Sequence, residues 1–149
     1  MTCRAYDEDF DVKDAAGAVA RIRAAVREAD AVLFATPEYN SSIPGFLKNA
    51  VDWLSRPSLA ESALRGKPVA VVGASIGVFG AVWAQADLRK VLGATGARVI
   101  DGEVALGRAM DRFDADGRLD DENLGAEVRE IVDGLLAEAE PQDPGKLAA

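Results

Sequence analysis

The 149-residue sequence contains no histidine and only one cysteine. Without histidine, the chain has no Ser-His-Asp or Cys-His triad, no His-ligated zinc and no imidazole for acid–base chemistry. The single thiol, Cys3, excludes an internal disulfide and a thiolate metal site, and its place near the terminus indicates an accessible thiol without a role. We therefore expect an enzyme of this composition to take its chemistry from a bound cofactor.

Long apolar runs and an excess of basic residues are also missing. No apolar run approaches the roughly 20 residues of a membrane span, and the first nine residues have no apolar core of a signal peptide. We therefore expect a cytoplasmic protein. Lys and Arg number 17 against 25 Asp and Glu, which gives a net charge of −8. Nucleic-acid binding needs clustered cations, so neither a nucleic acid nor a membrane is an expected partner.

Apolar runs alternate with helical patterns along the chain. Residues 31–36 and 68–73 are predicted to form buried strands, because runs without charged residues suit strands covered on both faces. A third strand is predicted within residues 97–106, with a break at Asp101 and Gly102. Helices are predicted at residues 15–29, 44–55, 81–95 and 121–139. This alternation predicts one α/β domain with a parallel sheet over residues 1–140, followed by a disordered tail at residues 141–149.

The most informative segment joins the first predicted strand to the next helix. It reads Thr36-Pro-Glu-Tyr-Asn-Ser-Ser-Ile-Pro-Gly-Phe-Leu-Lys-Asn-Ala-Val-Asp-Trp53. Its polar and aromatic groups follow the carboxyl end of a strand, where open α/β sheets bind ligands. Pro44 suits the first turn of a helix, where its missing N–H costs nothing. We expect that helix to bury Phe46, Leu47, Ala50, Val51 and Leu54.

A glycine-rich loop at residues 73–80 follows the second predicted strand and opens a helix. Free backbone N–H groups at a helix N-terminus favour anions. The glycine spacing fits neither the dinucleotide-binding fingerprint nor the Walker A motif. A tight strand-to-helix turn that needs glycine for its backbone alone is the alternative interpretation.

Three segments closely resemble the NADPH-dependent FMN reductase family of flavodoxin-like proteins, which includes quinone, chromate and azo-dye reductases. They are residues 36–53, 66–80 and 88–100, and the likeness runs from about Tyr6 to about Leu136. The resemblance implies a flavodoxin-like parallel sheet in a three-layer α/β/α fold. It also implies FMN and NADPH or NADH as cofactors, a small-molecule electron acceptor, and a homodimer or homotetramer.

The resemblance also implies a set of cofactor-binding residues. In the family, the loop matching residues 37–41 runs along the flavin ring, and residues matching Ser75 and Gly77 face the ring from the other side. The predicted set is Pro37, Glu38, Tyr39, Asn40, Ser41, Ser75 and Gly77. No catalytic side chain is predicted, because hydride transfer to a flavin needs positioning more than a protein acid. An ordinary turn is the alternative for residues 37–41.

The chain departs from the family pattern in two places. Family members open with a strand and a phosphate-binding loop rich in Gly, Ser, Arg and Asn, and we expect this chain to be N-terminally truncated relative to them. A start site assigned too far downstream and a short paralogue are the two explanations. Many members also carry Arg within residues 81–84, where this chain has Trp83. Trp83 is expected to pack; stacking on a ring or filling a subunit interface are the alternatives.

The sequence therefore predicts an NAD(P)H-dependent FMN oxidoreductase that passes hydride to flavin and electrons to a quinone-like or other small acceptor. Two alternatives remain: an acidic FMN electron carrier without NAD(P)H activity, and a cofactor-free remnant that acts as an interaction subunit. Residues 112–123 resemble a calcium loop, but Arg112 and Asn123 stand where its first and last ligands belong. We predict an Asp-Gly turn there, followed by a helix cap at Asp120 or Asp121.

Overall fold

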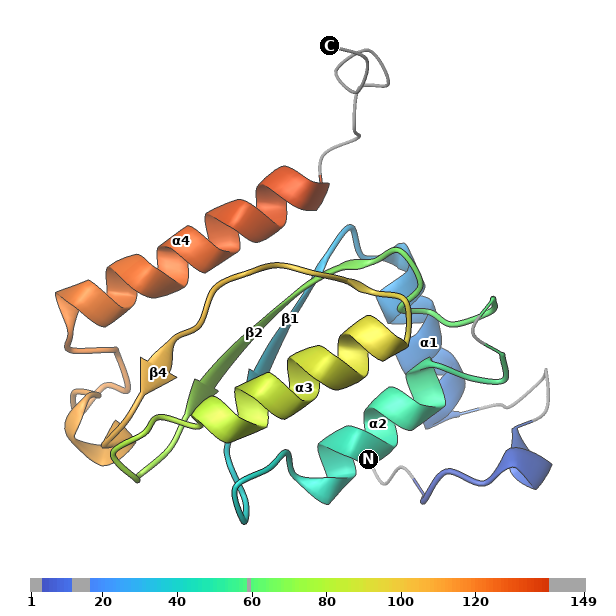
Figure 1. Cartoon of the computed structure of the whole chain (residues 1–149), viewed down its shortest axis with the longest axis horizontal. Helices are drawn as coiled ribbons and strands as arrows, with labels where there is room; N and C mark the ends of the chain where they lie inside the picture. Colours follow the sequence, from blue (N-terminus) through green and yellow to red (C-terminus); the bar gives the residue numbers. More distant parts are fainter. Residues whose placement is uncertain (1–3, 12–16, 59, 140–149) are drawn as a thin grey trace, which may run out of the picture.

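The computed structural model describes residues 4–11, 17–58 and 60–139. Cys3, the predicted tail and the start of the helix predicted at residue 15 lie outside these ranges. The described chain alternates strands and helices, as Figure 1 shows. The strands are β1 (Val32–Thr36), β2 (Pro68–Ala74), β3 (Arg98–Val99) and β4 (Ala105–Leu106). The helices are α1 (Ala18–Glu28), α2 (Gly45–Leu54), α3 (Val82–Ala94) and α4 (Glu122–Ala139), with short 3-10 turns η1 (Glu8–Phe10) and η2 (Ala109–Asp111).

The sheet is parallel and has β2 at its centre. β1 pairs with one side of β2, with Val32 opposite Val69. β3 and β4 both pair with the other side of β2, so they are two pieces of one strand position. The predicted break at Asp101 and Gly102 is confirmed, since both residues lie between β3 and β4.

Helices cover the two faces of the sheet, as Figure 1 shows. Val69 and Val71 of β2 point into a core formed with α1, α2 and α3, which includes Leu88. The intervening Ala70 points into a second core formed with α4, which includes Ile131. This alternation follows from the two-residue repeat of a strand. The predicted three-layer α/β/α arrangement is therefore confirmed.

Side-chain contacts hold the N-terminal segment at residues 4–11. Asp11 accepts two hydrogen bonds of 2.7 Å from the Arg23 guanidinium, whose Nε donates to the Trp53 carbonyl at 2.8 Å. Tyr6 packs edge-on against Trp53, with ring centroids 4.8 Å apart. These contacts join the segment to α1 and α2. Burial, followed by the carboxylates of Asp11 and Glu8, raises the pKa of Tyr6 above its ordinary value.

Two predictions of burial are wrong. Phe46 was expected in the core, but its side chain is 69% exposed, because α2 turns Val51, Trp53 and Leu54 inward instead. β1 was expected to be covered on both faces, but burial alternates along the strand and one face is left exposed. Leu33 on this strand is 42% exposed, since α4 packs over β2.

Candidate functional site

Three loops meet at the carboxyl end of the sheet, because parallel strands end there together. We call them the β1 loop (residues 37–44), the β2 loop (residues 75–81) and the β4 loop (residues 107–112). Within the described ranges, every non-glycine residue with a positive φ lies in these loops: Asn40 (52°), Ser41 (58°), Ala81 (63°) and Arg108 (51°). Strained backbone of this kind concentrates at binding and catalytic sites. The carboxyl end of the sheet, with these three loops, is therefore the candidate functional site.

The β1 loop is built around a tight turn. Tyr39 and Ser42 exchange backbone hydrogen bonds of 3.0 and 3.1 Å across Asn40 and Ser41, whose positive φ values are those of a type I′ turn. Tyr39 is 57% exposed at the start of this turn. Among the described residues, none accepts a hydrogen bond from the N–H groups of Asn40 and Ser41. The turn therefore offers one aromatic ring and two backbone donors to a ligand.

Two side chains of the β1 loop fasten it to α3. The Glu38 carboxylate accepts hydrogen bonds of 3.1 Å from the backbone N–H groups of both Trp83 and Ala84. Ser42 Oγ donates to Asp87 Oδ2 at 2.6 Å. The N-terminus of α3, predicted from the sequence to favour anions, thus receives a carboxylate from the protein itself.

The β2 and β4 loops are in backbone contact. The N–H of Arg108 donates to the Gly77 carbonyl at 2.9 Å, and the N–H of Ala109 donates to the Ser75 carbonyl at 3.0 Å. A Cβ on Gly107 would lie 2.2 Å from the Val78 carbonyl oxygen, so only glycine permits this approach. Gly107 thus has a packing reason, and both interpretations of residues 73–80 stay open.

Sequence reasoning missed Gln85, a buried side chain that supports this contact. Gln85 on α3 is fully buried, and its Nε2 donates to the carbonyls of Gly80 (3.2 Å) and Val104 (2.9 Å). It links the β2 loop to the strand that precedes the β4 loop. A glutamine within a helical pattern normally marks the solvent face, so the sequence carried no signal for this role.

Apolar side chains on the β2 and β4 loops and at the start of α3 face solvent. Phe79 and Trp83 are 62% and 46% exposed, and their rings contact each other edge-on at 5.2 Å. Trp83 was expected to pack, and its ring packs on Phe79 at the surface, while its neighbour Ala84 takes the buried position on α3. Exposed apolar side chains also include Ile76, Val78 and Met110. A cluster of this kind marks a surface for binding.

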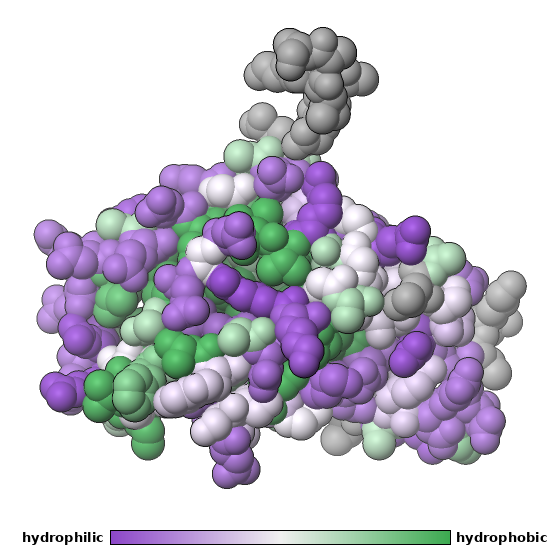
Figure 2. All heavy atoms as spheres, in the orientation of Figure 1, coloured by the Kyte–Doolittle hydropathy of each residue, from purple (hydrophilic) through white to green (hydrophobic). Residues whose placement is uncertain are grey.

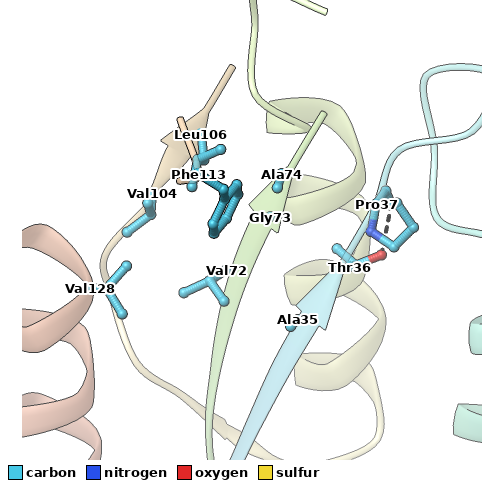
Figure 3. Close-up of a pocket in the computed structure, with 10 residues that line it drawn as sticks. All are labelled: Ala35, Thr36, Pro37, Val72, Gly73, Ala74, Val104, Leu106, Phe113 and Val128. Carbon is cyan, nitrogen blue, oxygen red and sulfur yellow. Dashed lines mark hydrogen bonds between the residues drawn. The ribbon is translucent and has the colours of Figure 1, made fainter. Parts of the chain in front are cut away.

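An apolar cavity of about 360 Å³ opens beside these loops on the α4 side of the sheet. Figure 3 shows Val72, Val104, Val128 and Phe113 directed into it, and Figure 2 shows hydrophobic residues in a hollow below α4. Of the predicted site residues, Pro37 lines this cavity. Glu38, Tyr39, Asn40 and Ser41 continue from Pro37 into the β1 loop, whereas Ser75 and Gly77 lie in the β2 loop against the β4 loop.

The acidic segment after the β4 loop is structural. Asp114 Oδ1 accepts hydrogen bonds from the N–H groups of Asp116 and Arg118, which closes the predicted Asp-Gly turn. Asp121 Oδ1 accepts from the N–H groups at the start of α4 at 3.1 Å, which places the predicted cap at Asp121. Over the described ranges, His, Cys, Asp and Glu side chains form no group of three or more that suits a metal ion. No described helix is long and apolar enough to cross a membrane.

Comparison with known proteins identifies the family. The sequence model of the NADPH-dependent FMN reductases matches residues 3–111, which is most of the chain. This chain belongs to the NADPH-dependent FMN reductase family. It is 45% identical over 132 residues to an NAD(P)H-dependent FMN reductase of Pseudomonas aeruginosa, which covers 88% of this chain and 68% of that protein. It is 42% identical over 117 residues to a quinone reductase of Pseudomonas putida, covering 78% of this chain and 62% of the relative.

A solved structure of the family has the same fold. The flavoenzyme NAD(P)H:(acceptor) oxidoreductase FerB from Paracoccus denitrificans superposes with a TM-score of 0.76 at 34% identity. The match covers 93% of this chain and 75% of that structure. The flavodoxin-like fold predicted from the sequence is therefore confirmed. The matched region of this chain covers 62% to 75% of the length of these three proteins.

Proposed function

We propose that this protein is an FMN-containing oxidoreductase that transfers hydride from NAD(P)H to flavin and then passes electrons to a quinone-like or other small acceptor. The observation that carries the proposal is the junction of the β1 loop with α3 through Glu38. It joins the loop after β1 to the helix that follows the neighbouring parallel strand β2, at the carboxyl end of the sheet, where open α/β sheets bind ligands. Family membership supplies the cofactor class and the reaction class.

The residues of the β1 and β2 loops fit a flavin ring. A flavin has a polar edge of nitrogen and oxygen atoms beside apolar ring faces. The N–H groups of Asn40 and Ser41 suit that polar edge, and the Pro37 and Tyr39 side chains suit the ring faces. In this proposal, Glu38 joins these four residues on one side of the ring, and Ser75 and Gly77 stand on the other. Bound FMN would supply the hydride acceptor and the two-electron transfer.

The chain's own groups bind and orient rather than transfer protons. The Glu38 carboxylate is already engaged with two backbone N–H groups, so it is not assigned the role of a general base. Tyr39 is exposed, so its ring is accessible to a bound flavin. The exposed Phe79 and Trp83 rings support the proposal that the protein works as a homodimer or homotetramer. We propose the cytoplasm as its location, where NAD(P)H is available.

A flavin titration followed by anaerobic reduction tests this function. FMN fluorescence is titrated with the purified protein, and the complex is then mixed with NADPH or NADH while the visible flavin absorbance is followed. We expect saturable binding and bleaching of the bound flavin, with reoxidation on adding a quinone. Reduction by dithionite but by neither nicotinamide nucleotide would favour the electron carrier. Absence of FMN binding would contradict the proposal and favour the cofactor-free subunit.

A further inference from the structure

We infer that Glu38 is a positioning residue whose carboxylate holds the β1 loop in its ligand-binding form by capping α3. The inference rests on the proposed function, because it assigns a role to one residue of the proposed flavin site. It also changes the role expected from the sequence, which placed Glu38 among the residues that contact the cofactor. In the structure its carboxylate contacts α3.

Glu38 supplies a helix cap that the local sequence lacks. The N-cap position of α3 is Ala81, which has a left-handed backbone and no side-chain acceptor. Trp83 and Ala84 occupy the second and third positions of the helix, and these are the N–H groups that an N-cap side chain normally satisfies. Glu38 Oε2 accepts from both at 3.1 Å. A carboxylate at this end of a helix is also favoured by the helix dipole.

The turn that carries the free donors lies between two fastened residues. Glu38 is bonded to the first turn of α3 before it, and Ser42 is bonded to Asp87 after it. The intervening residues Tyr39, Asn40 and Ser41 are exposed, and the two backbone hydrogen bonds between Tyr39 and Ser42 lie within the turn itself. Loss of the Glu38 contact therefore frees one end of the turn. A ligand would then have to order the loop on binding, which lowers its affinity.

The Glu38 carboxylate also fills the place where the N-terminus of α3 would otherwise attract an external anion. This gives the positioning role a specific signature. Removing the carboxylate with Glu38→Ala leaves two N–H groups without an acceptor, and a small carboxylate such as acetate is the chemical equivalent of the group removed. Free acetate can accept from these N–H groups, but it is not joined to the β1 loop and cannot fasten it.

The experiment compares FMN dissociation constants of wild type, Glu38→Ala and Glu38→Gln by fluorescence titration. Glu130→Ala, an exposed carboxylate on α4, is the matched control for the change in net charge. We expect Glu38→Ala to weaken FMN binding about tenfold. Glu38→Gln retains an oxygen acceptor and should stay within about threefold of wild type. Acetate should not restore FMN binding in Glu38→Ala, because a free carboxylate caps α3 without fastening the β1 loop.

Three results would overturn the inference. They are wild-type FMN affinity in Glu38→Ala, full restoration of that variant's FMN affinity by acetate, and an equal loss in Glu130→Ala. Hydrogen exchange of the Trp83 and Ala84 amides tests the contact without flavin; Glu38→Ala should accelerate it about tenfold, and unchanged exchange would refute the cap. If wild type binds no FMN, the proposed function and the positioning role both fail, while exchange still decides whether the cap exists.

Discussion

At the scale of single residues, the contacts that define this molecule join segments far apart in the sequence. Arg23 binds Asp11 through two guanidinium nitrogens and the Trp53 carbonyl through a third. The Asp11 and Arg23 side chains are only 1% and 9% exposed. An ion pair this deeply buried depends on both partners, because either charge left alone in the interior is costly.

Asp11→Ala is therefore expected to lower the free energy of unfolding by about 3–5 kcal/mol. The control is Asp116→Ala, which breaks the exposed pair with Arg118 and should cost less than about 1 kcal/mol. Urea unfolding followed by circular dichroism measures both. Equal small losses for the two variants would show that the N-terminal segment contributes little to stability.

At the scale of elements, the site depends on the backbone contact between the β2 and β4 loops. Gly107→Ala would place a methyl group 2.2 Å from the Val78 carbonyl oxygen, so the two loops must separate. We expect a loss of about 1–3 kcal/mol of stability together with weaker FMN binding. Gly45→Ala on α2 has open space around the new methyl group and serves as the control. Thermal unfolding and flavin titration of both variants test this, and equal behaviour would refute it.

Local patterns were sufficient for most elements. The apolar runs located β1 and β2, and Asp101-Gly102 marked the break in the third strand. Phe46 shows the limit, because its exposure depends on which side of α2 the rest of the chain covers. Glu38 shows the limit of local sequence patterns more clearly. The sequence placed it in a binding loop, but a cap on a helix 45 residues later is a tertiary contact without a local signal.

At the scale of the whole molecule, the described chain leaves apolar surface on one side. β1 carries no charged residue and forms the edge of the sheet, and Leu33 is exposed on it. The apolar cavity beneath α4 opens on the same face as Ala35. An unprotected, uncharged edge strand favours association with other chains, against which the net charge of −8 acts.

We predict that this chain associates through the β1 edge. Leu33→Lys should lower the average mass seen by light scattering at high protein concentration and reduce binding of a hydrophobic dye, because a lysine on an edge strand disfavours pairing. Leu136→Lys makes the same chemical change at an exposed position of α4. An effect of equal size in both variants would assign the association to general hydrophobicity rather than to β1.

The most direct test of the proposed site is amide mapping of FMN binding on the ¹⁵N-labelled protein. The account predicts that the largest shifts on adding FMN occur at Glu38, Tyr39, Asn40 and Ser41 and at Ser75 and Gly77, with smaller shifts along α4. Such a pattern would place the flavin between the β1 and β2 loops. Shifts confined to α4 and the apolar cavity, or no shifts with saturating FMN, would contradict the central claim that these loops form the flavin site.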